Sequence, residues 1–229
     1  MTAQINTIAV DGDPALAGHT TYQMVVELPQ TASTVYTIYG TEDATASVPG
    51  AYQAPTPFGA NTGGVTPQFF GFLPLAQYDS WLTVGLTEGD SAGALSSIGI
   101  DWASWQPGST LRITDGAVFY LDPSSVEPSS SSVVAQITVP TGTAWTATLN
   151  MQGSSTGTEP DWQAEGVLWD SEDAPRCPTT YLGPEVGFQN LMQFNDDNGN
   201  CEISMEELSR VCSGDMFNTC MSMLQSSGR

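Results

Sequence analysis

Oxygen-bearing side chains recur at fixed intervals near the end of the chain. When Asp196 is counted as position 1, they occupy positions 1, 3, 5, 9 and 12, as Asp196, Asn198, Asn200, Ser204 and Glu207. Carboxylate, amide and hydroxyl oxygens are the hard donors that calcium prefers, and a glutamate at position 12 supplies both of its carboxylate oxygens. The spacing therefore predicts a calcium-binding loop.

This loop resembles that of the EF-hand family. The resemblance implies that Glu202 contributes its backbone carbonyl and that Ser204 contacts the ion directly or through water. Only two of the ligating side chains, those of Asp196 and Glu207, bear a charge, so the expected dissociation constant lies in the range of extracellular modules, roughly 10⁻⁴ to 10⁻³ M. Apolar residues flank the loop at helical spacing, as the family requires: Phe188, Leu191, Met192, Leu208, Val211 and Cys212.

Position 6 of the loop is Cys201, where the family has glycine. That position usually takes a left-handed conformation, which costs a residue other than glycine about 1–2 kcal/mol. A disulfide at Cys201 would either hold the turn that glycine otherwise allows or rigidify a loop that no longer binds metal. We expect calcium binding, because every ligand position keeps an oxygen donor, and we expect a structural site instead of a switch.

All four cysteines lie in the last quarter of the chain, as Cys177, Cys201, Cys212 and Cys220. Their even number and their clustering predict two disulfides and an oxidising compartment. Three pairings are open. Zinc is the competing interpretation, but the spacings contain no C-x-x-C pair and no histidine is near.

Short alternating segments separated by Gly, Pro, Ser and Asp extend from about residue 5 to residue 170. This pattern is typical of a β-sandwich or barrel. The sequence thus predicts a mainly β chain, with a jelly-roll-like β-sandwich over residues 1–172 and a small disulfide-tied, α-helical, EF-hand-like module over residues 173–229. The expected strands are 21–28, 35–39, 80–86, 111–114, 117–121, 133–139, 145–149 and 162–169.

Turn residues predict how some of these strands connect. A turn from Pro29 would join 21–28 to 35–39 as a hairpin, and Asp115-Gly116 would join 111–114 to 117–121. The first hairpin is similar in pattern to residues 135–153, which suggests an internal repeat. A long segment rich in Pro, Gly and aromatic residues, from Val48 to Leu75, is either functional or a cover over the edge of the sandwich.

The charge of the chain is one-sided, with 25 acidic residues against four arginines and no lysine, for a net charge of -21. Nucleic acids and anionic lipid surfaces attract basic faces, so this composition argues against both as partners. Residues 1–10 have neither the basic n-region nor the apolar run that a signal peptide is expected to show, and no apolar run approaches the roughly 18 residues of a membrane span. Such a surface suits cations, cationic partners or a high-salt medium that screens its self-repulsion.

Three phrases, at positions 57–64, 79–85 and 115–123, resemble secreted β-rich proteins of marine algae and protists. This resemblance implies secretion and indicates no particular activity. It agrees with the compartment that the cysteines predict.

The sequence allows two further kinds of site, one for sugar binding and one for glycoside hydrolysis. Exposed tryptophans on a sandwich can stack on sugar rings, and Trp102 and Trp105 are the pair we expect to be partly exposed. Two carboxylates can hydrolyse a glycosidic bond, and the chain offers many acids for such a pair: Asp79, Glu88, Asp90, Asp101, Asp115 and Asp161. The single histidine, His19, is not accompanied by a G-x-S-x-G elbow, and there is no phosphate-binding loop.

The sequence therefore favours a secreted, non-enzymatic, calcium-binding structural protein of an extracellular matrix, an adhesion surface, or a self-assembling coat or filament. Its partners would be calcium and either a second copy or an extracellular glycan. The alternatives are a carbohydrate-binding module and a carboxylate-based glycoside hydrolase.

Overall fold

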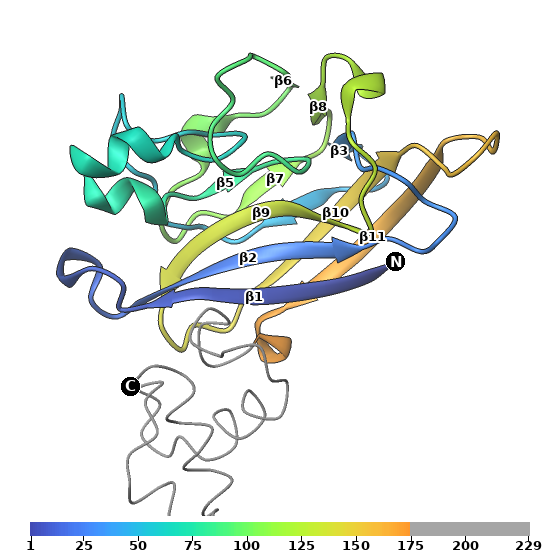
Figure 1. Cartoon of the computed structure of the whole chain (residues 1–229). Coiled ribbons are helices and arrows are strands. Elements are labelled where there is room, and N and C mark those ends of the chain that lie inside the picture. The colour runs from blue at the N-terminus through green and yellow to red at the C-terminus, as the bar shows by residue number, and fades with distance from the viewer. Residues whose placement is uncertain (175–229) are drawn as a thin grey trace, which may run out of the picture.

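The computed structural model describes residues 1–174, which fold into two antiparallel sheets (Figure 1). The mainly β prediction is confirmed. The four-stranded sheet has the order β1 (Thr2–Val10), β2 (His19–Glu27), β9 (Ser131–Pro140) and β5 (Trp81–Leu82). The larger sheet has the order β6 (Leu95–Ile98), β8 (Gly116–Tyr120), β3 (Thr37–Gly40), β10 (Thr146–Gly153), β4 (Ala46–Val48) and β7 (Leu111–Ile113), with β11 (Trp162–Asp170) paired to β10.

One hydrophobic core contains residues from both sheets. Met24 of β2 and Ile137 of β9 are fully buried in it together with Leu149 of β10. The alternation of apolar residues along these strands places one face of each inward. Trp169 of β11 is also buried, and its Nε1 donates to the carbonyl oxygens of Gln4 and Val25, both at 3.0 Å. This indole therefore fastens β11 of the larger sheet to β1 and β2 of the smaller one.

Both predicted hairpins are wrong. Strand β2 pairs with β1 and β9, whereas β3 lies in the other sheet, so the segment after Pro29 crosses between sheets. Likewise β7 pairs with β4, while β8 pairs with β3 and β6. Turn residues fix where a strand ends, but the burial of both sheets on one core decides which edge the next strand joins.

The two stretches compared as a repeat both make this crossing. Strands β2 and β9 lie in the smaller sheet, and β3 and β10, which follow them, lie in the larger one. The corresponding strands pair with each other, with Met24 opposite Ala135 and Ile38 opposite Met151. The repeat itself stays a prediction.

Three strands were not predicted: β1, β4 and β6. Strand β1 carries Thr and Asn among its apolar residues, and β4 and β6 have only three and four residues. The expected strand 80–86 shortens to β5, although the amides of Thr83 and Gly85 continue the ladder by donating to Val134 and Val133.

The long segment 48–75 covers part of the smaller sheet. It contains the 3-10 helix η2 (Pro67–Gly71) and leads into η3 (Pro74–Tyr78), which Figure 1 shows at one corner of the molecule. Gln136 of β9 donates to the carbonyls of Gln77 and Asp79, at 3.0 and 2.8 Å, and Thr138 donates to that of Tyr78 at 2.6 Å. These bonds hold η3 against β9.

A buried carboxylate, that of Asp79, holds part of the same segment by hydrogen bonds. Asp79 is fully buried, and its two oxygens accept the backbone N–H groups of Ala54 and Ala60 at 2.7 and 2.6 Å. Burial raises the pKa of Asp79 to about 6, although these bonds and one from Ser80 act in the opposite direction. The loop from 54 to 60 is therefore fixed to the chain just before β5.

The last described element follows β11 directly. After β11, the 3-10 helix η6 (Ser171–Asp173) is capped by Asp170, whose Oδ1 accepts the amide of Glu172 at 3.0 Å. The module predicted over 173–229 lies, beyond residue 174, outside the described residues.

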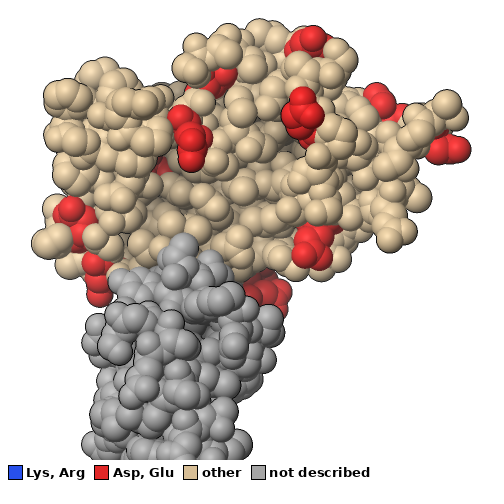
Figure 2. Space-filling view, viewed as in Figure 1, with Lys and Arg blue, Asp and Glu red and all other residues tan. Residues whose placement is uncertain are grey.

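Acidic side chains are spread over the described surface (Figure 2). Residues 1–174 contain 18 of the 25 acids, with Arg112 as their one arginine. The corner that contains η2 and η3 differs, because the 35 residues from 44 to 78 include no charged side chain. Within the described residues, no helix is long and apolar enough to cross a membrane.

Candidate ligand-binding groove

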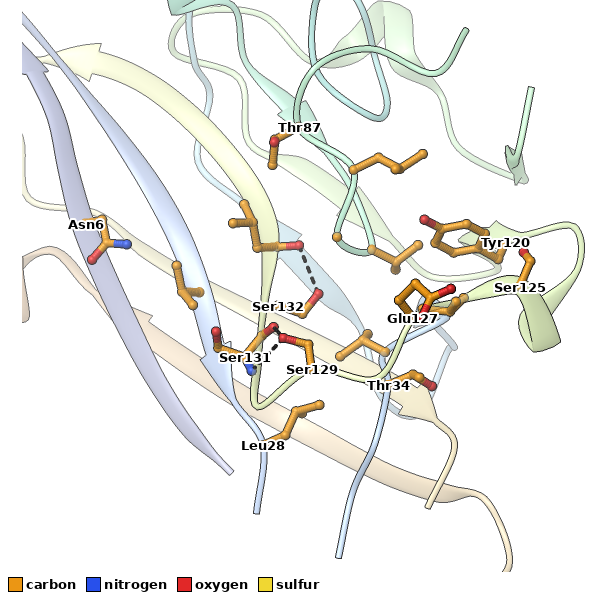
Figure 3. Close-up of a pocket in the computed structure, with 17 residues that line it drawn as sticks. Asn6, Leu28, Thr34, Thr87, Tyr120, Ser125, Glu127, Ser129, Ser131 and Ser132 are labelled. Atoms are coloured by element: carbon orange, nitrogen blue, oxygen red, sulfur yellow. Dashed lines mark hydrogen bonds between the residues drawn. The ribbon is translucent and has the colours of Figure 1, made fainter. Parts of the chain in front are cut away.

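A groove of about 640 Å³ opens beside the start of β9 and is lined by residues of both sheets (Figure 3). Its walls come from distant parts of the chain: the start of β9, the segment after β5, the loop from β8 to β9, the segment before β3, and single residues of β1 and β2. The described lining residues are Asn6, Val25, Leu28, Thr34, Val35, Val84, Gly85, Leu86, Thr87, Tyr120, Ser125, Val126, Glu127, Ser129, Ser131, Ser132 and Val133.

Hydroxyl groups and aliphatic side chains both line this groove. Ser129 Oγ donates to the carbonyl of Ser131 at 2.7 Å and accepts the amide of the same residue at 3.2 Å. Ser132 Oγ lies 3.4 Å from the carbonyl of Val133, and Thr34 Oγ1 accepts the amide of Ser154 at 3.0 Å. Each of these hydroxyl oxygens can accept at least one further hydrogen bond, because a hydroxyl has two acceptor lone pairs besides its one O–H donor.

Tyr120, Ser125 and Glu127 lie together on the side of the groove away from Asn6 (Figure 3). Burial raises the pKa of the Tyr120 phenol, and the charge of Asp90 raises it further, so the phenol stays protonated near neutral pH. Among the described lining residues, Glu127 is the one carboxylate. The hydroxyl groups of the lining can hydrogen-bond a ligand that itself carries hydroxyl groups, and the described lining residues offer no second carboxylate for glycoside hydrolysis.

The structure separates the two tryptophans expected to bind sugars. Trp105 is fully buried, and its Nε1 donates to the carbonyl of Pro49 at 2.9 Å, so the expectation that its face is exposed is wrong. Trp102 is partly buried, and its Nε1 donates to Ser97 Oγ at 3.1 Å. The two ring centroids are 6.2 Å apart, and the apolar faces of these rings pack on the core. Trp102 thus keeps part of its surface exposed, as expected, whereas Trp105 has no exposed face to offer a sugar ring.

Several candidate acids have structural partners. Asp79 is buried beneath the corner described above, and both oxygens of Asp90 accept backbone N–H groups, from Ala94 at 2.7 Å and from Leu95 at 2.8 Å. Asp161 accepts the phenol of Tyr36 at 2.7 Å, which raises the pKa of Tyr36, already raised by burial, to about 12. These carboxylates hold loops and strands together.

The predicted calcium ligands (Asp196, Asn198, Asn200, Glu202, Ser204 and Glu207) and all four cysteines lie outside the described residues. A second metal site is not evident in residues 1–174, where no group of three or more His, Cys, Asp or Glu side chains is placed to hold an ion. His19 Nδ1 lies 3.4 Å from the carbonyl oxygen of Ala17, at the start of β2.

The chain matches no protein-family model, no curated protein and no solved structure. The groove was not predicted, because its walls come from segments that only the tertiary fold brings together. The serine-rich stretch 124–132 is the one local signal for it, and its composition is typical of a polar loop.

Proposed function

We propose that this is a secreted, non-enzymatic, calcium-binding structural protein, built from a β-sandwich of jelly-roll type and a disulfide-tied EF-hand-like module. It would act in an extracellular matrix, in adhesion, or as a subunit of a self-assembling coat or filament. The observation that carries the proposal is the twelve-residue spacing from Asp196 to Glu207. Two sheets around one core supply a rigid body for such a role.

The test is calcium titration of the full chain by calorimetry, with thermal melting in calcium and in chelator. If the dissociation constant is near 10⁻³ M, calcium at ten times that concentration should raise the free energy of unfolding of the calcium-binding unit by about 1.4 kcal/mol. Glu207→Gln removes the bidentate ligand and abolishes the heat. Glu206→Gln removes the same charge at the neighbouring position and leaves the heat in place. If the unmodified chain gives neither heat nor a shift in melting, the proposal fails.

A second candidate function is favoured by the groove. We infer that its hydroxyl groups, its aliphatic side chains and the ring of Tyr120 suit a neutral oligosaccharide. On a glycan array, saturable binding lost in Tyr120→Ala and kept in Trp102→Ala would support this site. Binding lost only in Trp102→Ala would move the sugar site away from the groove, and an array without any binding would reject this function.

A further inference from the structure

The corner around η2 and η3 exposes apolar side chains on a chain that is otherwise acidic. We define the aromatic corner as residues 66–76 together with Phe58. Phe72 is 78 % exposed and Phe69 is 38 % exposed. An exposed apolar patch surrounded by polar surface marks an interaction site more often than an isolated exposed side chain does.

The aromatic corner is held in place by several kinds of contact. Phe58 packs edge-on against Phe69, with ring centroids 5.8 Å apart. Beneath them is a small second core of Ala54, Val65 and Ala76, separate from the main core. Gln136 and Thr138 of β9 and the buried Asp79 fix the ends of this segment. A surface that is already ordered binds with a smaller entropic cost.

The charge distribution points to the occupant. Two molecules of net charge -21 repel each other wherever their carboxylates approach. The aromatic corner lies within the uncharged residues 44–78, so its own residues bring apolar surface and no carboxylate to a contact. Asp11 and Asp13 lie beside the end of η3, where the carbonyl of Gly12 accepts the phenol of Tyr78 at 2.7 Å. We propose that the aromatic corner is the surface through which two copies of this chain associate, corner against corner. This inference rests on the self-assembly that the proposed function contains.

A membrane fits this surface less well. Segments that lie on a bilayer usually combine their apolar face with Lys and Arg, which contact the lipid headgroups. The aromatic corner has neither residue, and the acidic body around it is repelled by anionic lipids. The uncharged corner of a second copy meets no such repulsion.

The experiment is sedimentation velocity of the full chain over a range of concentrations, with calcium and with chelator. We expect concentration-dependent association in both, and at least about tenfold weaker association in Phe72→Ser, because each copy buries this ring. The matched control is Ile98→Ser, which removes an apolar side chain that is 67 % exposed on β6 and leaves association unchanged. Added salt should strengthen association, because it screens the repulsion between acidic bodies.

Three results would overturn the proposal. The first is a monomer at every concentration and salt level, and the second is equal weakening by Phe72→Ser and Ile98→Ser. The third is binding to phosphatidylcholine vesicles that is lost in Phe72→Ser while no self-association is seen, which would make a bilayer the occupant. The heat of calcium binding is measured on the same samples. If no heat is seen, only the calcium proposal is rejected. If heat is seen but the chain stays monomeric, only the proposed association through the aromatic corner is rejected.

Discussion

The buried carboxylate of Asp79 makes the stability of the β domain depend on pH in a specific way. Its folded-state pKa of about 6 lies above the ordinary value of 3.8, because burial disfavours the charged form. The folded state therefore binds a proton more readily than the unfolded state. Its stabilising contribution is complete below about pH 3.8 and is lost as the pH rises through about 6.

These two pKa values set the size of the effect. Between pH 7 and pH 5, the Asp79 carboxyl should add about 1.3 kcal/mol to the free energy of unfolding, out of about 3 kcal/mol over its whole range. Asp79→Asn removes this titration. At pH 7 the substitution has opposing effects, since it relieves a buried charge but turns an NH₂ group toward the amide of Ala54 or Ala60, at a cost of about 1–3 kcal/mol. The slope with pH is thus a cleaner measure than stability at one pH.

The assay is urea unfolding of the full chain, followed by tryptophan fluorescence. All six tryptophans lie within residues 1–174, so the signal reports on the β domain. The control is Glu42→Gln, which removes one charge from an exposed position and should keep the slope of the unmodified chain. Measurements in calcium and in chelator separate any titration of the calcium loop. Equal gains in stability from pH 7 to pH 5 in the unmodified chain and in Asp79→Asn would refute the reasoning.

Two further substitutions test how the sheets are held together. Trp169→Phe removes the indole N–H that donates to the carbonyls of Gln4 and Val25. Urea unfolding should show that the free energy of unfolding falls by about 2 kcal/mol. An unchanged midpoint would mean that this bridge between the sheets is not stabilising. Gly40→Ala would place a Cβ atom 1.9 Å from the carbonyl oxygen of Ile113, so thermal melting should show a loss above about 2 kcal/mol. Gly71→Ala meets no atom within 4 Å and should stay within about 0.5 kcal/mol, and similar melting of the two variants would contradict the close approach of β3 and β7.

The long alternating strands were predictable from the sequence because they bury one face on the core. Residues 21–28, 133–139, 145–149 and 162–169 correspond to β2, β9, β10 and β11. The connections between strands were not predictable, because a proline or an Asp-Gly pair marks the end of a strand without specifying the sheet that the next strand joins. The short strands β4 and β6 depend on their neighbours, and three or four residues carry too little pattern to be detected.

Side-chain surroundings were harder to predict than strands. Trp102 and Trp105 follow a charged residue among small polar ones, which favoured exposure, yet the fold buries Trp105 against Pro49. Asp79 was one of several acids in a very acidic chain, and only the structure shows that two backbone amides hold it beneath a loop. The groove shares this difficulty, since Tyr120 and Val25 become neighbours of one cavity only after the sheets pack.

The segment 48–75 was expected to be either a cover over the sandwich or a functional surface, and the same residues can serve as both. As a cover, it bonds to β9 through the amide of Tyr52, which donates to the carbonyl of Thr138 at 2.8 Å, and it leads into Gln77 and Tyr78, whose carbonyls accept Gln136 and Thr138. As a surface, its lack of charge makes it the place where two acidic molecules can touch. Binding one Ca²⁺ would change the net charge only from -21 to -19, too little to remove that repulsion. A calcium effect on assembly would therefore have to act through the structure of the tail, whereas salt would act through the charges that surround the aromatic corner.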